Sequence, residues 1–365
     1  MLEVLEGAGE GRLSFSRLLT YLTCPRKYYY RYVQRIGEAD VTPSLLLGTA
    51  THSFLEVMLR ERVDAQEAAA RVVREYVEEV CQLPVQLAEL LYEVSWGYSE
   101  LLARALPGYV GPDAIRNGDG TVPTDVLSYP SSSWRAEVRR HGELMRRRGE
   151  LDRLAGEANP LFRVHSCTDL FAQAWAFARV FQVPEWVART EGVELELAEV
   201  PLRPGLEAAK WVGVIDWVVR TKDGRTCLVD HKTGRSLPAS VDVQYHPQLA
   251  VYAYMWAHHH DGLLPELVAI HHVRSGRFCV VSVERDWVEE TVEYFAHLYE
   301  ASLVGLPHRH LPTEYNSPCV RRHYKTQALA QVCPYLERCW PAYYRRLLEE
   351  ETFVPGYSLE VNHGA

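Results

Sequence analysis

The 365-residue chain lacks long apolar segments, a signal-like N-terminus and an excess of positive charge. No apolar run approaches the roughly 20 residues of a membrane span, and the first residues contain neither the basic nor the apolar region of a signal peptide. We therefore expect a cytoplasmic protein with no membrane partner. The net charge of −9 argues against a surface that is basic throughout. Basic residues still cluster over 24–35 and 134–148, which indicates either a local basic groove or solvated helix faces.

Lysine is scarce, and the cysteines do not suggest disulfide bonds. One of only five lysines, Lys232, stands two residues after an aspartate, at the end of a predicted buried strand. Eight cysteines without a secretory signal do not indicate a disulfide framework. Cys319, Cys333 and Cys339 crowd near the C-terminus, and Cys24 stands far upstream. Four thiolates suit an iron–sulfur cluster or a structural zinc ion, and spacing alone does not separate these.

Helical periodicity dominates the chain up to about residue 190, and period-two patterns follow it. Residues 13–35 and 43–62 predict helices, the first of them broken at Pro25, and 106–133 predict a long loop. The strands that alternation and apolar runs predict are 193–201, 211–220, 226–232, 267–273 and 277–284, with helices at 247–260 and 286–303. We therefore expect an α/β fold: a mixed central sheet flanked by helices, a helical N-terminal lobe and a cysteine-bearing C-terminal segment.

Three predicted strands each carry a charged side chain on an otherwise apolar face. Alternation places Glu199 on such a face of the first strand and Asp216 on that of the second. Asp230 and Lys232 share a face of the third. Because an unpaired buried carboxylate is costly, such groups are usually paired or bind a metal ion.

The turn between the second and third strands decides whether the two aspartates meet. A two-residue turn would put Asp216 opposite His231 and send Asp230 to the other face. A three-residue turn over 222–224, ending in a left-handed glycine, would instead pair Asp216 with Asp230, with side chains about 5 Å apart and Lys232 one pleat away. That arrangement suits Mg²⁺ or Mn²⁺ and phosphoryl chemistry. The alternative is a buried Asp–Lys pair that only holds the sheet together.

Five stretches resemble, in order, the RecB-like branch of the PD-(D/E)XK nuclease superfamily, which includes the AddB C-terminal nuclease and CRISPR-associated iron–sulfur exonucleases. They are SFSRLLTYLTCPRKYYYRYV (14–33), GTATHSFLE (48–56), GVIDWVV (213–219), VDHKTG (229–234) and QLAVY (248–252). The resemblance covers about 1–60 and 193–340. It divides the chain into an N-terminal segment with the first cluster cysteine (1–62), a mostly helical insertion (63–192), a nuclease core (193–303) and a C-terminal iron–sulfur segment (304–365).

The resemblance implies a restriction-endonuclease-like core and roles for individual residues. Lys232 would be catalytic, and Glu199 matches an acid that often precedes the core. Gln248 and Tyr252, which share a helix face, would point toward the DNA or the site. The residues implied at a Mg²⁺ or Mn²⁺ ion are His52, Asp216, Asp230 and, through its carbonyl, His231.

The resemblance also implies a [4Fe–4S] cluster, with zinc as the alternative occupant. The spacing of Cys333 and Cys339 fits the final pair of that motif. Cys319 departs from it: the preceding cysteine is usually three residues before Cys333, where this chain has Ala330. With Cys24 as the fourth ligand, such a site would tie the N-terminal segment over the nuclease core.

We therefore expect a metal-dependent DNA exonuclease that acts on single strands or duplex ends in recombination, repair, phage replication or spacer processing, with a helicase or recombination partner. The aromatic, basic stretch 24–35 would line its strand channel. The alternative is a non-catalytic DNA-binding or scaffolding module of a helicase–nuclease assembly. A zinc hydrolase using 258–260, or His308 and His310, is less well supported, because consecutive histidines on a helix point in different directions.

Overall fold

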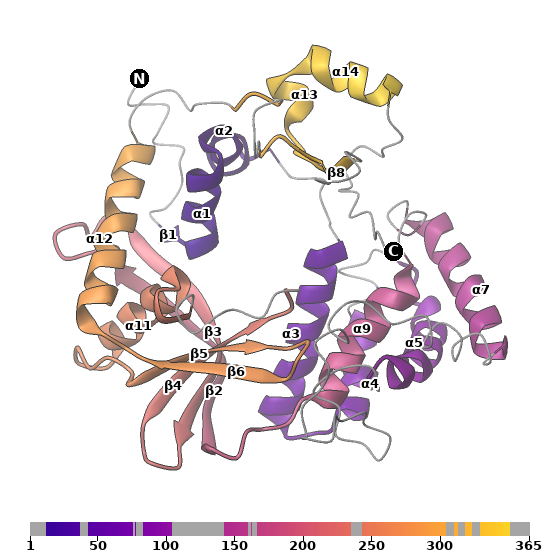
Figure 1. Cartoon of the computed structure of the whole chain (residues 1–365), viewed down its shortest axis with the longest axis horizontal. Helices are drawn as coiled ribbons and strands as arrows, with labels where there is room; N and C mark the ends of the chain where they lie inside the picture. Colours follow the sequence, from indigo (N-terminus) through magenta and orange to yellow (C-terminus); the bar gives the residue numbers. More distant parts are fainter. Residues whose placement is uncertain are drawn as a thin grey trace, which may run out of the picture.

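The computed structural model of the chain combines one mixed β-sheet with helices on both of its faces (Figure 1). The described residues are 12–36, 43–75, 77, 83–103, 142–159, 162, 166–234, 243–303, 310–312, 318–322 and 329–350. The predicted loop over 106–133 and the candidate His308 lie outside them. Among the described helices, none has the length and apolar character needed to cross a membrane.

Short helices follow β1 (Arg12–Leu13), and a helical lobe comes after them. α1 (Phe15–Thr23) begins at Ser14, whose hydroxyl accepts the N–H of Arg17 at 3.2 Å. As expected, a break at Pro25 separates α1 from α2 (Pro25–Tyr28), which continues into the π-helical turn η1 (Tyr29–Val33). The lobe consists of α3 (Pro43–Glu61), α4 (Ala65–Glu75), α5 (Leu87–Ala103), α7 (Gly142–Ala158) and α9 (Cys167–Val180).

The central sheet has the strand order β1-β3-β4-β5-β6, and β2 also pairs with β3. Its strands are β1 (Arg12–Leu13), β2 (Val187–Pro201), β3 (Lys210–Thr221), β4 (Thr226–Lys232), β5 (Leu267–His272) and β6 (Arg277–Ser282). β4 and β5 are parallel, whereas β2–β3, β3–β4 and β5–β6 are antiparallel. The predicted mixed sheet flanked by helices is confirmed, although β2 begins at Val187 rather than at 193.

Each face of the sheet packs on its own apolar core. Trp217 and Val229 point toward the core shared with α3 and α9, and Trp211 and Leu228 point toward the core shared with α11 (Pro247–His259) and α12 (Arg285–Ser302). Figure 1 shows these two groups of helices on opposite sides of the strands. The central strands β3, β4 and β5 are therefore largely buried on both faces, which explains their nearly continuous apolar sequences, whereas β2 and β6 remain partly exposed.

The C-terminal segment packs against the N-terminal helices. It contains β7 (Val320–Arg322), β8 (Leu329–Val332), α13 (Leu336–Cys339) and α14 (Pro341–Glu350). Tyr335 donates a hydrogen bond to the carbonyl of Ile36 at 2.8 Å, and its ring lies 5.3 Å from that of Tyr30. Residues 299 positions apart in sequence therefore lie together.

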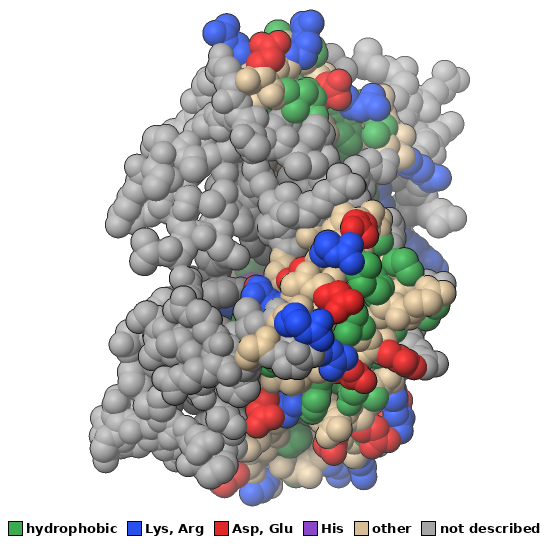
Figure 2. Space-filling model, turned by 90° about the vertical axis from the view of Figure 1, so that its right-hand side faces the viewer, with side chains coloured by type: hydrophobic (Ala, Val, Ile, Leu, Met, Phe, Trp, Pro, Cys, Tyr) green, Lys and Arg blue, Asp and Glu red, His purple; other side chains and the backbone are tan. Residues whose placement is uncertain are grey.

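The described part of the basic run 134–148 lies on α7 and is paired with acids. Arg147 contacts Glu93 of α5, and Arg148 lies 2.7 Å from Asp169 of α9. Figure 2 shows basic and acidic side chains interspersed on this side of the molecule. For residues 142–148, these ion pairs favour the solvated helix face over the basic groove.

Candidate active site

The turn between β3 and β4 has the three-residue form that brings the two aspartates together. The N–H of Thr221 donates to the carbonyl of Arg225 at 2.9 Å, and Gly224 has a φ of +85°. Only glycine adopts this left-handed conformation at little cost. The register that follows from this turn places Asp216 opposite Asp230. Of the two turns considered from the sequence, the three-residue form is therefore the one present.

The ammonium of Lys232 is held by two side chains. Its Nζ lies 2.7 Å from Oδ2 of Asp230 and 2.9 Å from Oε1 of Gln248. The amide nitrogen of Gln248 donates to Oδ1 of Asp230 at 3.0 Å and to the hydroxyl of Tyr252 at 2.7 Å. The i,i+4 spacing of Gln248 and Tyr252 thus places both in one hydrogen-bond network with the lysine and its aspartate. Gly213 leaves room for Tyr252, since a Cβ there would lie 3.2 Å from the Tyr252 ring.

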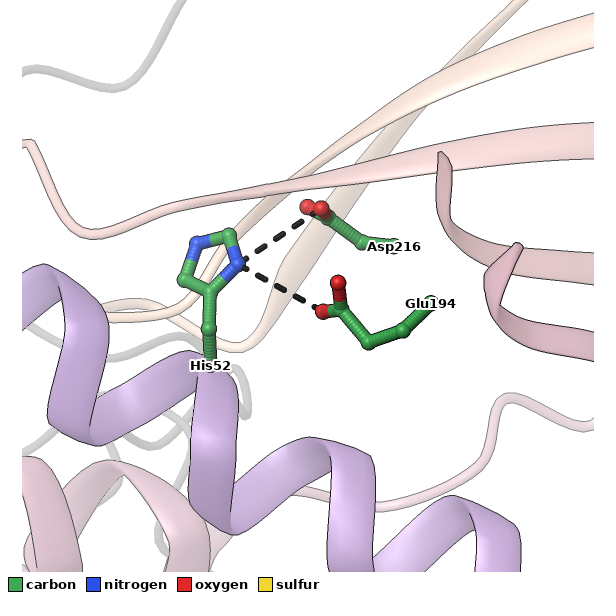
Figure 3. Close-up of side chains that lie close together, drawn as sticks. All are labelled: His52, Glu194 and Asp216. Atoms are coloured by element: carbon green, nitrogen blue, oxygen red, sulfur yellow. Dashed lines mark ion pairs between the residues drawn. The ribbon is translucent and has the colours of Figure 1, made fainter. Parts of the chain in front are cut away.

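His52 of α3 reaches the same end of the sheet (Figure 3). Its Nε2 lies 3.0 Å from the carbonyl oxygen of His231. Its Nδ1 lies 3.5 Å from Oδ1 of Asp216 and 4.0 Å from Oε1 of Glu194. The second Asp216 oxygen accepts the backbone N–H of His231 at 2.6 Å. The structure therefore brings together three of the expected residues and adds Glu194.

Glu194 stands where Glu199 was expected. The β2–β3 register places Glu194 opposite Asp216, between the pairs that flank both residues. Glu199 instead lies at an exposed position, where Arg12 and Lys210 pair with its carboxylate. Both glutamates have positive φ, +48° and +60°, and the register shifts along β2. These irregularities break the two-residue alternation, so strict counting from the sequence pointed to Glu199, whereas the structure places Glu194 beside Asp216.

The ring of His231 lies 6.0 Å from that of His52, between centroids, and contacts a second histidine. It is buried beside Trp217, and its Nδ1 lies 2.9 Å from Nδ1 of His271 on β5. Burial lowers the pKa of His231 to about 4, against the opposing charge of Asp216, so the imidazole is neutral. The atom of His231 that contacts His52 Nε2 is its carbonyl oxygen.

The close packing of acids perturbs the titration of the whole group. Burial and then the charge of Asp216 raise the pKa of Glu194 to about 7. Burial disfavours the charged form of His52, but the hydrogen bond and charge of Asp216 outweigh it and raise the pKa of His52 to about 9. For Asp230, burial raises the pKa, and the charge of Lys232 only partly opposes this shift. The group thus retains protons near neutral pH, as expected of ligands that are crowded without a cation.

The donor set fits a divalent cation. One ligand atom each from His52, Glu194 and Asp216 lies within 4.8 Å of the others. The carbonyl of His231 contacts His52, and the β3–β4 register places Asp230 opposite Asp216. Carboxylate and carbonyl oxygens with one imidazole suit Mg²⁺ or Mn²⁺. The raised pKa of Glu194 is consistent with this, because bound positive charge would offset both the burial and the charge of Asp216 that raise it.

Among the described residues, the consecutive histidines 258–260 do not converge on one ion. His259 contacts the carbonyl of Ala198 at 3.1 Å, and His260 stacks on Trp256 with ring centroids 3.6 Å apart. The rings of His258 and His259 are perpendicular. These contacts agree with the expectation that consecutive helical histidines point in different directions.

The four candidate cluster cysteines lie in the contact region of the N- and C-terminal segments. Cys24 is buried and accepts the N–H of Lys27 at 3.4 Å. The N–H of Cys333 donates to the carbonyl of Cys319 at 2.8 Å. Burial raises the pKa of the Cys333 thiol to about 12, and neighbouring Cys319 and Cys24 add to that shift. Cys339 is buried in α13. A thiol that resists ionisation as that of Cys333 does becomes a thiolate readily only when a metal ion supplies positive charge.

A family model described as the PD-(D/E)XK nuclease superfamily matches residues 12–165 and 139–340. The two matches overlap and together extend from β1 to the last of the clustered cysteines. No curated protein matches the chain.

Proposed function

The chain belongs to the PD-(D/E)XK nuclease superfamily, and on that premise we propose that it is a Mg²⁺- or Mn²⁺-dependent DNA exonuclease of the RecB-like branch. One observation carries the proposal. The Lys232 ammonium lies 2.7 Å from Asp230, and Asp230 lies opposite Asp216 at the end of the sheet. A lysine beside two opposed, buried carboxylates suits phosphodiester hydrolysis, whereas a scaffold would gain nothing from these costly charges.

In this proposal the side chains have separate tasks. His52, Glu194, Asp216 and Asp230, with the carbonyl of His231, would hold the cation, which supplies positive charge to the phosphate and acidifies water. Lys232 would orient the attacking water and compensate the charge that develops on the phosphate oxygens. Gln248 and Tyr252 position that lysine by fixing its neighbours.

DNA would enter past the stretch 24–35, in which several aromatic rings are engaged in packing. Tyr28 is 5% exposed and Tyr30 packs on Tyr335, so these two rings contact protein and do not bind DNA bases. The guanidinium of Arg31 lies 5.2 Å from the ring of Tyr32, which is only partly buried. Such stacked arginine and tyrosine pairs can bind both phosphates and bases of a single strand.

The proposed exonuclease activity requires DNA ends. Linear single-stranded DNA and duplex DNA labelled at one end should be shortened in Mg²⁺ or Mn²⁺, and the label position then reports the polarity. Closed circular DNA of the same sequence should persist. Equal degradation of circular DNA would contradict the exonuclease assignment and leave an endonuclease. We further propose that this activity serves recombination, repair, phage replication or spacer processing with a helicase or recombination partner.

Metal binding should release protons and strengthen as the pH rises. The pKa of His52 is about 9 and that of Glu194 about 7, so a cation competes with protons for both groups. From about pH 6.5 to about pH 8.5, the dissociation constant of Mn²⁺ should fall at least tenfold. Calorimetry in two buffers with different ionisation enthalpies measures both effects. His52→Gln, which cannot hold that proton, should flatten the dependence, and pH-independent binding by the wild type would contradict the assignment.

We propose that Cys24, Cys319, Cys333 and Cys339 hold a [4Fe–4S] cluster that joins the two ends of the chain. Anaerobically purified protein should be brown, absorb broadly at about 400 nm and contain about four iron atoms. Cys333→Ser should lose the colour and lower the melting temperature. The matched variant Cys279→Ser, in β6, should retain both. A colourless protein with one bound zinc ion would replace the cluster by a structural zinc site.

A further inference from the structure

Lys232 is the last residue of β4, a place where a strand usually begins to fray. Its parallel partner β5 ends at His272, and Lys232–His272 is the final pair of the ladder. Catalytic groups need to be held to about 0.5 Å. The backbone beyond Lys232 therefore needs an anchor that the sheet does not supply.

Three consecutive residues of β5 and its following turn bind three consecutive carbonyl groups at this point. The N–H of Val273 donates to the carbonyl of Lys232 at 3.0 Å. Nε of Arg274 donates to the carbonyl of Thr233 at 2.8 Å, and Nε2 of His272 lies 2.9 Å from that of Gly234. We call this arrangement, from 272–274 to 232–234, the carbonyl clamp.

The side chains of the clamp are themselves fixed. His272 is 1% exposed, and its Nδ1 lies 2.7 Å from the hydroxyl of Ser275. With the serine donating to Nδ1, the ring carries its proton on Nε2, as donation to the carbonyl requires. The guanidinium of Arg274 lies 5.2 Å from the ring of Phe177 on α9. The helical lobe thus supports the Arg274 side chain of the clamp.

We propose that His272 and Arg274 are positioning residues for Lys232. Their hydrogen bonds bind the carbonyls of Thr233 and Gly234, the two residues that follow the last paired residue of β4. These bonds fix the backbone from which the Lys232 ammonium reaches Asp230 and Gln248. This proposal rests on the proposed nuclease function for its kinetic consequences. Its structural claim concerns only where the Lys232 ammonium lies.

Removing the side chain of either His272 or Arg274 should slow catalysis without weakening the binding of DNA or Mn²⁺. In Arg274→Ala and His272→Leu, kcat should fall between about tenfold and about a hundredfold, because displacement by about 1 Å costs on that order. KM for DNA and the affinity for Mn²⁺ should stay within about twofold. Arg274→Lys and His272→Gln, which still offer a donor, should recover most of the loss. The control Arg277→Ala changes an exposed arginine of the same hairpin and should behave as wild type.

The position of the ammonium can be observed without activity. With only five lysines, reductive ¹³C-methylation gives few resonances, and Lys232→Arg assigns the one of interest. Arg274→Ala should shift the Lys232 resonance and its titration, and leave that of Lys210 unchanged. An unshifted Lys232 resonance with wild-type kcat would overturn the proposal. The proposal would also be overturned if Arg274→Ala or His272→Leu lowered kcat, DNA binding and the melting temperature together, as a general loss of folding would. If the wild type hydrolysed no DNA, the nuclease proposal would fail, and the resonance would still decide whether the clamp positions Lys232.

Discussion

Lys232→Ala should lower the rate of DNA hydrolysis at least about 10³-fold and leave the fold and Mn²⁺ binding unchanged. The Lys232 side chain is 37% exposed, so its loss opens no large cavity in the core. Asp230 would lose its ion pair but keep the hydrogen bond from Gln248. The expected defect is therefore one of chemistry rather than of folding. Single-turnover cleavage of labelled DNA, with circular dichroism and Mn²⁺ titration of the same sample, measures the three properties.

Lys210→Ala is the matched control for this experiment. Lys210 lies in the same sheet and is similarly exposed, at 39%, but it pairs with Glu199 outside the acidic group. Its loss should leave hydrolysis within about twofold of wild type. A Lys232→Ala variant with near-normal cleavage would remove the lysine from the mechanism.

Asp230→Asn should abolish hydrolysis, weaken Mn²⁺ binding at least about tenfold, and not reduce stability in the absence of metal. Asp230 is 1% exposed, and burial raises its pKa above the unfolded value. For a carboxyl group with a raised folded-state pKa, the stabilising contribution exists at low pH and is lost as the pH rises through that pKa. At neutral pH the charged group therefore costs stability, and asparagine removes that cost. Denaturant unfolding in EDTA at about pH 7 measures the sign.

Asp223→Asn provides a comparison of opposite sign. Asp223 is exposed in the β3–β4 turn, where Arg225 and then Thr221 lower its pKa to about 2. A carboxyl group with a lowered pKa stabilises the fold above its unfolded pKa, so Asp223→Asn should reduce stability at neutral pH and leave hydrolysis nearly unchanged. If Asp230→Asn were the less stable of the two and still bound Mn²⁺ normally, Asp230 would be a structural residue rather than a ligand.

The centre of the site could be predicted from the sequence because its geometry is local. Lys-Asp-Gly over 222–224 permits a three-residue turn, and that turn alone determines that Asp216 and Asp230 meet. Gln248 and Tyr252 share a helix face by simple i,i+4 spacing. Each of these relations spans few residues and follows from regular backbone geometry.

Glu194 could not be predicted in the same way. Its place opposite Asp216 depends on register shifts and on left-handed backbone at two non-glycine residues, Glu194 and Glu199. Alternation assumes that neither occurs. The only signal available was that β2 contains three further acids, Glu191, Glu194 and Glu196, and nothing in the sequence ranks them against Glu199.

Contacts between residues far apart in the sequence could not be predicted from periodicity either. His52 lies off the centre of its helix's apolar stripe, and only the family resemblance placed it near His231, 179 residues away. His272 and Arg274 look like ordinary residues of a strand end and a turn. Their hydrogen bonds to the 232–234 backbone depend on the parallel pairing of β4 with β5, which side-chain periodicity does not specify.

The most direct test of a metal-dependent nuclease site is a Mn²⁺ titration of the wild-type protein in which metal binding and cleavage of end-labelled single-stranded DNA are followed together. Both should rise over the same range of Mn²⁺ concentration, and EDTA should abolish cleavage. Undiminished cleavage in EDTA, or no cleavage at Mn²⁺ concentrations that saturate His52, Glu194, Asp216 and Asp230, would contradict the account.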